Sequence, residues 1–95
     1  MPEGLFELTS FQRDLLYVTA GRDRPSGQAI KEEVEREYDE ITHGRLYPNL
    51  DTLAEKGYIE KGQINRRTNS YVATDQGHDA IHQRREWERR YVNHE

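Results

Sequence analysis

Four side chains that can bind a nucleic-acid base or phosphate recur at helical spacing between residues 45 and 56. They are Arg45, Asn49, Thr52 and Lys56, at positions i, i+4, i+7 and i+11. Arginine is the usual partner of guanine in the DNA major groove, and asparagine is the usual partner of adenine. The same segment carries an apolar stripe made of Leu46, Leu50, Leu53 and Ala54. The pattern predicts a helix over Arg45–Lys56 whose polar stripe lies opposite the apolar one. A plain solvated helix face is the alternative for this stripe, and for Thr52 the two interpretations balance.

A second group of cations follows this helix. Gly57 ends the helix, and two strand-like runs, 58–64 and 69–74, are joined by residues 65–68. Arg66 and Arg67 lie in that connection, where two cations suit phosphate contact or minor-groove insertion, while a plain exposed turn is the alternative. Asn69 begins the second run and is grouped with them. A polar-basic helix followed by a hairpin tipped with arginines is typical of a winged-helix DNA-binding module.

Three more side chains are candidates for DNA contact. The ring of Tyr47 can pack where two helices meet while its hydroxyl reaches a phosphate. Ser26 and Gln28 begin a further predicted helix, where hydroxyl, amide and backbone N–H groups can face a phosphate. For Ser26, capping of the helix is the simpler interpretation.

The elements that position these residues are predicted as helix, helix, helix, two-stranded wing and helix. Thr9 or Ser10 caps a first helix through about Ala20, Ser26 caps the second, and Thr74 caps a last helix through about Val92. The stripe Ile30, Val34 and Tyr38 faces inward from the second helix. The core is completed by Tyr58, Ile59, Ile64, Tyr71 and Val72. The predicted class is α+β and mostly helical, with a winged helix-turn-helix domain over 1–74 and a dimerisation helix over 75–95.

The last helix carries aromatic residues that no other part of the chain is expected to cover. Trp87 and Tyr91 continue a stripe from Ala80, and large aromatics on a charged helix usually mark burial against a partner. The apolar lead-in near the N-terminus can dock on the same helix. The predicted homodimer interface comprises Leu5, Phe6, Leu8, Ala80, Ile81, Arg84, Trp87 and Tyr91.

Composition and charge narrow the function classes. The chain has 95 residues, 33% of them hydrophobic, which predicts one small domain with a thin core and favours self-association. It has no cysteine, no secretory signal and no apolar run long enough to span a membrane, so we expect a cytoplasmic protein. The net charge is −4, yet residues 41–74 hold five cations against three acids and form the positive segment.

No pattern in the sequence indicates catalysis or a cofactor. His78 and His82 have the i, i+4 spacing of a zinc-binding pair, but no cysteine or HExxH motif accompanies them. Two surface histidines are therefore the favoured interpretation, and a small metal-dependent enzyme is the weakest alternative. We expect no metal, no cofactor and no enzymatic activity.

The run Gly44-Arg45-Leu46-Tyr47-Pro48-Asn49-Leu50, followed by Leu53, Glu55, Lys56 and Gly57, resembles the PadR-like winged-helix transcriptional regulators. The later Arg67, Tyr71, Thr74 and Gly77 resemble the wing of that family and the entry to its last helix. The resemblance extends over about residues 9–80. It implies a homodimeric repressor that reads promoter DNA and pairs through its last helix. Family members often respond to small hydrophobic or phenolic effectors, but no effector is assigned to this chain.

The leading hypothesis is a sequence-specific transcription regulator that represses by promoter occlusion. A two-fold dimer would place two recognition helices in successive major grooves, about 34 Å apart, over an inverted repeat in double-stranded DNA. The alternative is a winged helix used for protein–protein interaction in a larger complex. Modules of that kind tend to lose the basic residues of the third helix and wing, and this chain keeps both.

The cation composition suggests a salt-rich cytoplasm such as that of a halophile. The chain has eleven arginines but three lysines, and six acids lie within Glu32–Glu40. Molar salt screens the repulsion among such acids to within about 3 Å. We expect the melting temperature to rise from dilute buffer to molar KCl and specific DNA binding to survive there. Thermal melts and fluorescence anisotropy across a KCl series check this. A flat or falling melting temperature with a steep loss of affinity contradicts it.

Overall fold

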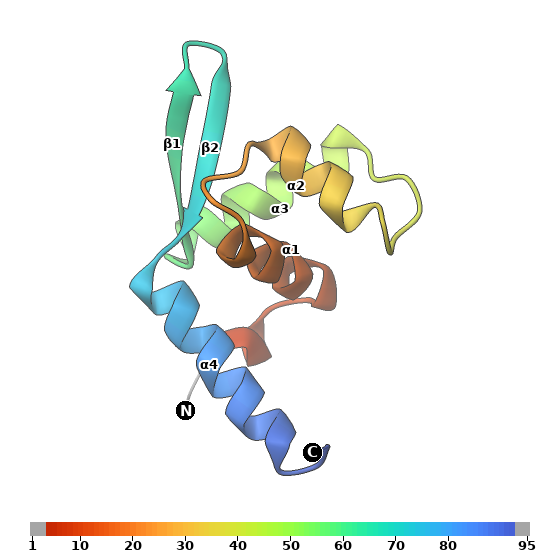
Figure 1. The fold of residues 1–95 in the computed structure, drawn as a ribbon, viewed down its shortest axis with the longest axis vertical. Coiled ribbons are helices and arrows are strands. Elements are labelled where there is room, and N and C mark those ends of the chain that lie inside the picture. The colour runs from red at the N-terminus through yellow and green to blue at the C-terminus, as the bar shows by residue number, and fades with distance from the viewer. Residues whose placement is uncertain (1–3, 93–95) are drawn as a thin grey trace.

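The computed structural model describes residues 4–92 and has the predicted order of elements (Figure 1). The α+β winged helix-turn-helix class is confirmed. The elements are a 3₁₀ turn η1 (Gly4–Glu7), the helices α1 (Ser10–Gly21), α2 (Gly27–Val34) and α3 (His43–Glu55), the strands β1 (Ile59–Asn65) and β2 (Thr68–Ala73), and the helix α4 (Asp75–Arg89). The first three residues of the predicted winged-helix domain and the last three of the predicted dimerisation helix lie outside the described residues.

Each α-helix is preceded by a threonine or serine N-cap, whose side chain accepts a hydrogen bond from the third backbone N–H of the helix. The four caps are Thr9, Ser26, Thr42 and Thr74. Thr9 forms a full capping box with Gln12, because each side chain bonds the other residue's backbone N–H. The third helix starts at His43, two residues earlier than predicted, because Thr42 acts as its cap.

The second helix ends at Val34 and does not continue to Tyr38 as its apolar spacing predicts. The Glu35 carboxylate accepts a hydrogen bond from the backbone N–H of Ile41 at 2.8 Å and pairs with Lys31 at 3.0 Å. The backbone hydrogen bond and the ammonium together lower the pKa of Glu35. These contacts fold residues 35–42 into a loop, so four of the six acids expected on the helix lie in that loop.

The core lies between the helices and the base of the hairpin. Leu46, Leu50 and Leu53 of α3 are fully buried. The predicted core residues Ile64 and Val72 are instead exposed, 55% and 43% respectively. Ile64 lies near the tip of the hairpin, whose outer half extends beyond the helices in Figure 1. Val72 lies near the base, between the buried Tyr71 and Ala73, and its side chain takes the opposite, solvent-facing side of the strand.

The hairpin is joined to the start of α2. The backbone N–H of Tyr71 donates to the carbonyl of Pro25 at 2.9 Å, and Ser26 and Ser70 form a single antiparallel bridge. Ser70 is buried at this junction. The wing and the N-terminus of α2 therefore hold a fixed position relative to each other.

The turn η1 lies beside α4 and covers part of the stripe expected to bind a second protomer (Figure 1). Leu5, Leu8 and Ala80, which the sequence assigns to the dimer interface, are buried in the chain's own core. Ile81 packs against that core and is half-buried. Little surface of these residues remains for a partner, because the chain's own N-terminal turn occupies it.

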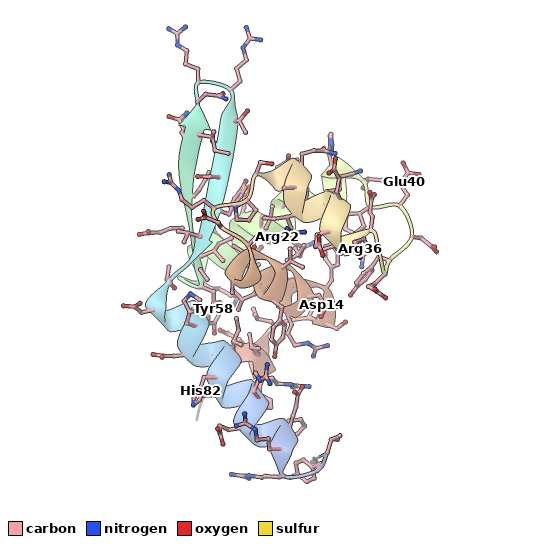
Figure 2. The ribbon with its side chains drawn as sticks, in the orientation of Figure 1. Asp14, Arg22, Arg36, Glu40, Tyr58 and His82 are labelled. Atoms are coloured by element: carbon pink, nitrogen blue, oxygen red, sulfur yellow. The ribbon has the colours of Figure 1, made fainter. Side chains whose placement is uncertain are left out.

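The same turn also reaches α3 and the base of the wing. The Glu7 carboxylate accepts a hydrogen bond from the Tyr58 hydroxyl at 2.6 Å and pairs with Lys56 at 3.3 Å. The Tyr58 hydrogen bond, with Lys56 adding to it, lowers the pKa of Glu7. Figure 2 places Tyr58 where the hairpin meets α4. No helix among residues 4–92 is long and apolar enough to cross a membrane.

Candidate nucleic-acid interface

The polar stripe predicted to read bases does not lie opposite the buried leucines of α3. It lies on the flank of the helix that faces α1 and η1. The Asn49 side-chain oxygen accepts a hydrogen bond from Gln12 of α1 at 2.9 Å, and its amide nitrogen donates to the carbonyl of Arg45 at 2.7 Å. Asn49 is thus occupied by neighbours within the chain, and its role as a base reader stays a prediction.

The other three residues of the stripe also have partners in the chain. The Arg45 guanidinium lies 4.0 Å from the centre of the Phe11 ring, while the Thr52 hydroxyl donates to the carbonyl of Pro48 at 3.0 Å. Lys56 pairs with Glu7. Arg45 and Lys56 remain exposed, so both can still reach a phosphate.

The face of α3 that points away from the core carries four exposed residues. They are Gly44, Pro48, Asp51 and Glu55, again spaced i, i+4, i+7 and i+11. These positions are the farthest around the helix from the three buried leucines. Sequence reasoning missed Asp51 because it selected cations and amides by residue type. The position of the leucines was the signal that could have found it.

Asp51 connects this outward face to the wing. Its carboxylate lies 3.3 Å from the ammonium of Lys61 on β1. Burial raises the pKa of the Tyr71 hydroxyl, and the nearby Tyr47 and Asp51 add to that rise. α3 and the hairpin therefore share one polar surface at this point.

Tyr47 packs across the start of α2, in agreement with the prediction that its ring lies between the two helices. A Cβ atom at Gly27 would lie 2.6 Å from Cε1 of the Tyr47 ring, so any side chain at this position would displace the ring. Ser26 caps α2 through Ala29, as the simpler interpretation expects. Gln28 is exposed and donates to Glu32 at 3.0 Å. Tyr47 and the N-terminus of α2 thus lie side by side.

The wing tip presents its two arginines to solvent. The Asn65 side chain accepts hydrogen bonds from the backbone N–H groups of Arg67 and Thr68, at 2.9 and 3.1 Å, which closes the turn. Within residues 4–92 the side chains of Arg66 and Arg67 have no ion-pair partner. Asn69 is exposed on β2. The tip is therefore a pair of uncompensated cations.

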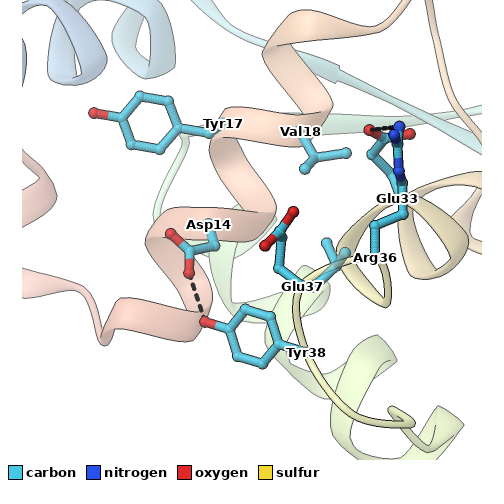
Figure 3. A pocket seen from close by; sticks show the side chains of 8 residues that line it. Asp14, Tyr17, Val18, Glu33, Arg36, Glu37 and Tyr38 are labelled. Carbon is cyan, nitrogen blue, oxygen red and sulfur yellow. Dashed lines mark hydrogen bonds and ion pairs between the residues drawn. The ribbon is translucent and has the colours of Figure 1, made fainter.

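The acid-rich side of the molecule lies between α1 and the loop that follows α2. There the Tyr38 hydroxyl donates to Asp14, and Glu33 pairs with Arg36 (Figure 3). Glu33 also pairs with Arg22. The Arg22 and Arg36 guanidinium groups lower the pKa of Glu33, and the hydrogen bond to Asp14 raises that of Tyr38. An open pocket of about 540 Å³ lies among these residues. Its carboxylates make it unsuited to a phosphate backbone.

The two histidines of α4 do not gather metal ligands. His82 lies 3.9 Å from Glu86 and points away from the body of the molecule (Figure 2). Among the described residues no group of three histidine, cysteine, aspartate or glutamate side chains is placed to hold a metal ion.

The model of the transcriptional regulator PadR-like family matches residues 15–83, from α1 into α4. The chain belongs to the PadR-like family. This agrees with the resemblance of its third helix and wing. No similar protein was found among the curated proteins.

Solved structures agree with this family assignment. RosR of H. salinarum, from a crystal grown with NaBr, is 42% identical over 96% of this chain and 83% of that chain, with a TM-score of 0.88. The complex called hsRosR-S1 is 46% identical over 88% of this chain and 75% of that chain, with a TM-score of 0.83. A PadR-like transcription factor from Bacteroides fragilis, at 13% identity over 82% of this chain and 80% of that chain, shares the fold with a TM-score of 0.70. The chain described in this structure is thus a DNA-binding transcriptional regulator of the PadR-like family.

We expect Arg66→Ala and Arg67→Ala to weaken binding to all duplexes alike, because phosphate contacts carry no sequence information. Each loss should lower the slope of log affinity against log salt by about 1. Fluorescence anisotropy over a salt series measures both quantities on an operator and on an unrelated duplex. Arg36→Ala, on the acid-rich side, is the control and should leave the slope unchanged. Weaker binding to the operator with unchanged binding to the unrelated duplex would contradict the phosphate role.

Proposed function

We propose that this PadR-like protein is a homodimeric, sequence-specific repressor that acts by covering a promoter. It would work in the cytoplasm and without enzymatic activity. The observation that supports this best is the continuous surface formed by the outward face of α3, the N-terminus of α2 and the wing. Tyr47 on Gly27, Asp51 on Lys61, and the Pro25–Tyr71 hydrogen bond join its three parts. Such a surface can meet a major groove and both flanking phosphate backbones.

An aromatic cluster on α4 and η1 supports the homodimer. The rings of Phe6 and Trp87 meet edge to face with centroids 5.3 Å apart, and Trp87 and Tyr91 are also 5.3 Å apart. The Arg84 guanidinium lies 4.7 Å from the centre of the Trp87 ring and 5.3 Å from that of Phe6. Phe6, Trp87 and Tyr91 are 46%, 38% and 67% exposed. Clustered exposed aromatics with an arginine are the composition of an interface centre.

This cluster narrows the proposed interface to the outer part of α4 and one residue of η1. It retains Phe6, Arg84, Trp87 and Tyr91 from the sequence-based set, with residues 75–92 as the described part of the dimerisation helix. Pairing by a two-fold axis through this region would present two α3 helices to the same side of a duplex. An inverted repeat with half-sites one helical turn apart, about 34 Å, would fit that arrangement.

We also propose that the arginine-rich, acidic composition adapts the protein to concentrated salt. The likeness to RosR of H. salinarum supports it, since both chains share 42% of their residues over most of their length. An acidic surface with arginine as the main cation would keep the protein soluble in concentrated salt.

The experiment that tests the proposed function combines light scattering with binding to the promoter upstream of the protein's own gene. Wild type should be a dimer at micromolar concentration and bind that duplex as a dimer in preference to a scrambled one. Trp87→Ala should remove about 2–4 kcal/mol of interface stability, as truncation of a buried aromatic anchor does, and should release monomers. His82→Ala, an exposed change on the same helix, is the matched control and should stay dimeric. A monomeric wild type, or a Trp87→Ala variant that stays fully dimeric, would contradict the proposed dimer interface. Equal binding to the promoter and the scrambled duplex would contradict sequence-specific repression.

A further inference from the structure

The outward face of α3 offers few groups that can hydrogen-bond a base. Gly44 has no side chain, and Pro48 has neither a polar side chain nor a backbone N–H. Both are exposed on the first turns of the helix, which are the turns that enter a major groove. Asp51 is the next residue along this face, and its side chain is 57% exposed. A base pair facing the middle of α3 would therefore meet the Asp51 carboxylate.

The small residues on this face decide how near the groove floor can come. A Cβ built at Gly44 would meet no atom closer than 3.9 Å, so the space beside it is open. Pro48 adds only a compact ring. A duplex can thus approach the backbone of α3 closely at these positions, and a short side chain such as that of Asp51 suffices to reach a base edge.

The chemistry of a carboxylate selects one base. An ionised carboxylate only accepts hydrogen bonds. In the major groove guanine and thymine present acceptors, and adenine presents an acceptor beside its amino group, whereas cytosine presents the N4 amino donor alone. We propose that Asp51 is a specificity-determining residue that accepts a hydrogen bond from the N4 amino group of a cytosine in each half-site. This inference rests on the proposed function, since it requires α3 to lie in the major groove.

Lys61 makes a carboxylate at this position compatible with DNA. An unpaired negative charge in the groove would be repelled by the phosphates on both sides. The ammonium of Lys61, 3.3 Å away on β1, offsets that charge and comes from the wing, which is itself on the DNA side. The pair leaves lone pairs of the carboxylate free for a base, because one ammonium contact does not occupy all of its acceptor sites.

Selection of binding sites from a random duplex pool tests the assignment on the full chain. Wild type should select a motif with cytosine at one position per half-site. Asp51→Ala should lose the preference at that position and bind the wild-type site roughly 5- to 150-fold less tightly, the range of one base contact. It should bind an unrelated duplex at least as tightly as wild type, because a negative charge is gone. Asp51→Asn should change the preferred base at that position from cytosine to adenine, because an amide side chain can form two hydrogen bonds with adenine.

Two control variants separate base reading from an effect through Lys61 or through charge alone. Lys61→Met should still select cytosine at that position but should bind every duplex less tightly, because a cation is lost. Glu37→Gln, an equal charge change at an exposed residue on the acid-rich side of the molecule, should select the wild-type motif. An unchanged motif in both Asp51 variants overturns the inference and leaves the proposed function intact. The inference is also overturned if Asp51→Ala and Lys61→Met lose the preference for cytosine to the same extent. If wild type selects no motif, both the proposed sequence-specific function and this inference are contradicted.

Discussion

The burial of Leu46, Leu50 and Leu53 is the constraint on which the interface depends. Three fully buried leucines on one stripe fix how α3 is rotated about its own axis, and rotation decides which residues point outward. Turning the helix by one position would expose leucines and bury polar side chains, at about 1.5–3 kcal/mol for each leucine brought to the surface. The exposed face of α3 is thus a consequence of its core contacts.

The turn η1 is the second constraint, because it connects regions that are far apart in the sequence. Phe6 contacts the Trp87 ring of α4, and the next residue, Glu7, contacts both Lys56 at the end of α3 and Tyr58 at the base of the wing. The same short turn therefore touches the proposed dimer cluster and the end of the proposed recognition helix. In a dimer, the spacing of the two α3 helices would depend on this connection.

The sequence predicted the order and type of the elements because the signals for them are local. Threonine and serine caps, apolar periodicity and the glycine after α3 all act within a few residues. Contacts between residues far apart in the sequence could not be predicted in this way. The Asn49 side chain, which the sequence selects as a base reader, accepts a hydrogen bond from Gln12 of α1, and its contact with DNA stays a prediction. Leu5, Leu8 and Ala80 look unpartnered along the chain, but they cover one another once η1 folds onto α4. The helix after Ser26 stops early because Glu35 binds a backbone N–H six residues ahead.

We propose that the face of α3 bearing Gly44 and Asp51 lies closer to the bases of DNA than the flank bearing Asn49 and Thr52. Because the chain contains no cysteine, a single introduced thiol can report on each face. The most direct measurement is the rate of thiol alkylation in Gly44→Cys and in Thr52→Cys, with and without saturating operator duplex. We expect DNA to slow modification of the thiol introduced by Gly44→Cys strongly and that of the thiol introduced by Thr52→Cys much less. Stronger protection of the thiol introduced by Thr52→Cys would contradict it and return base reading to the predicted polar stripe.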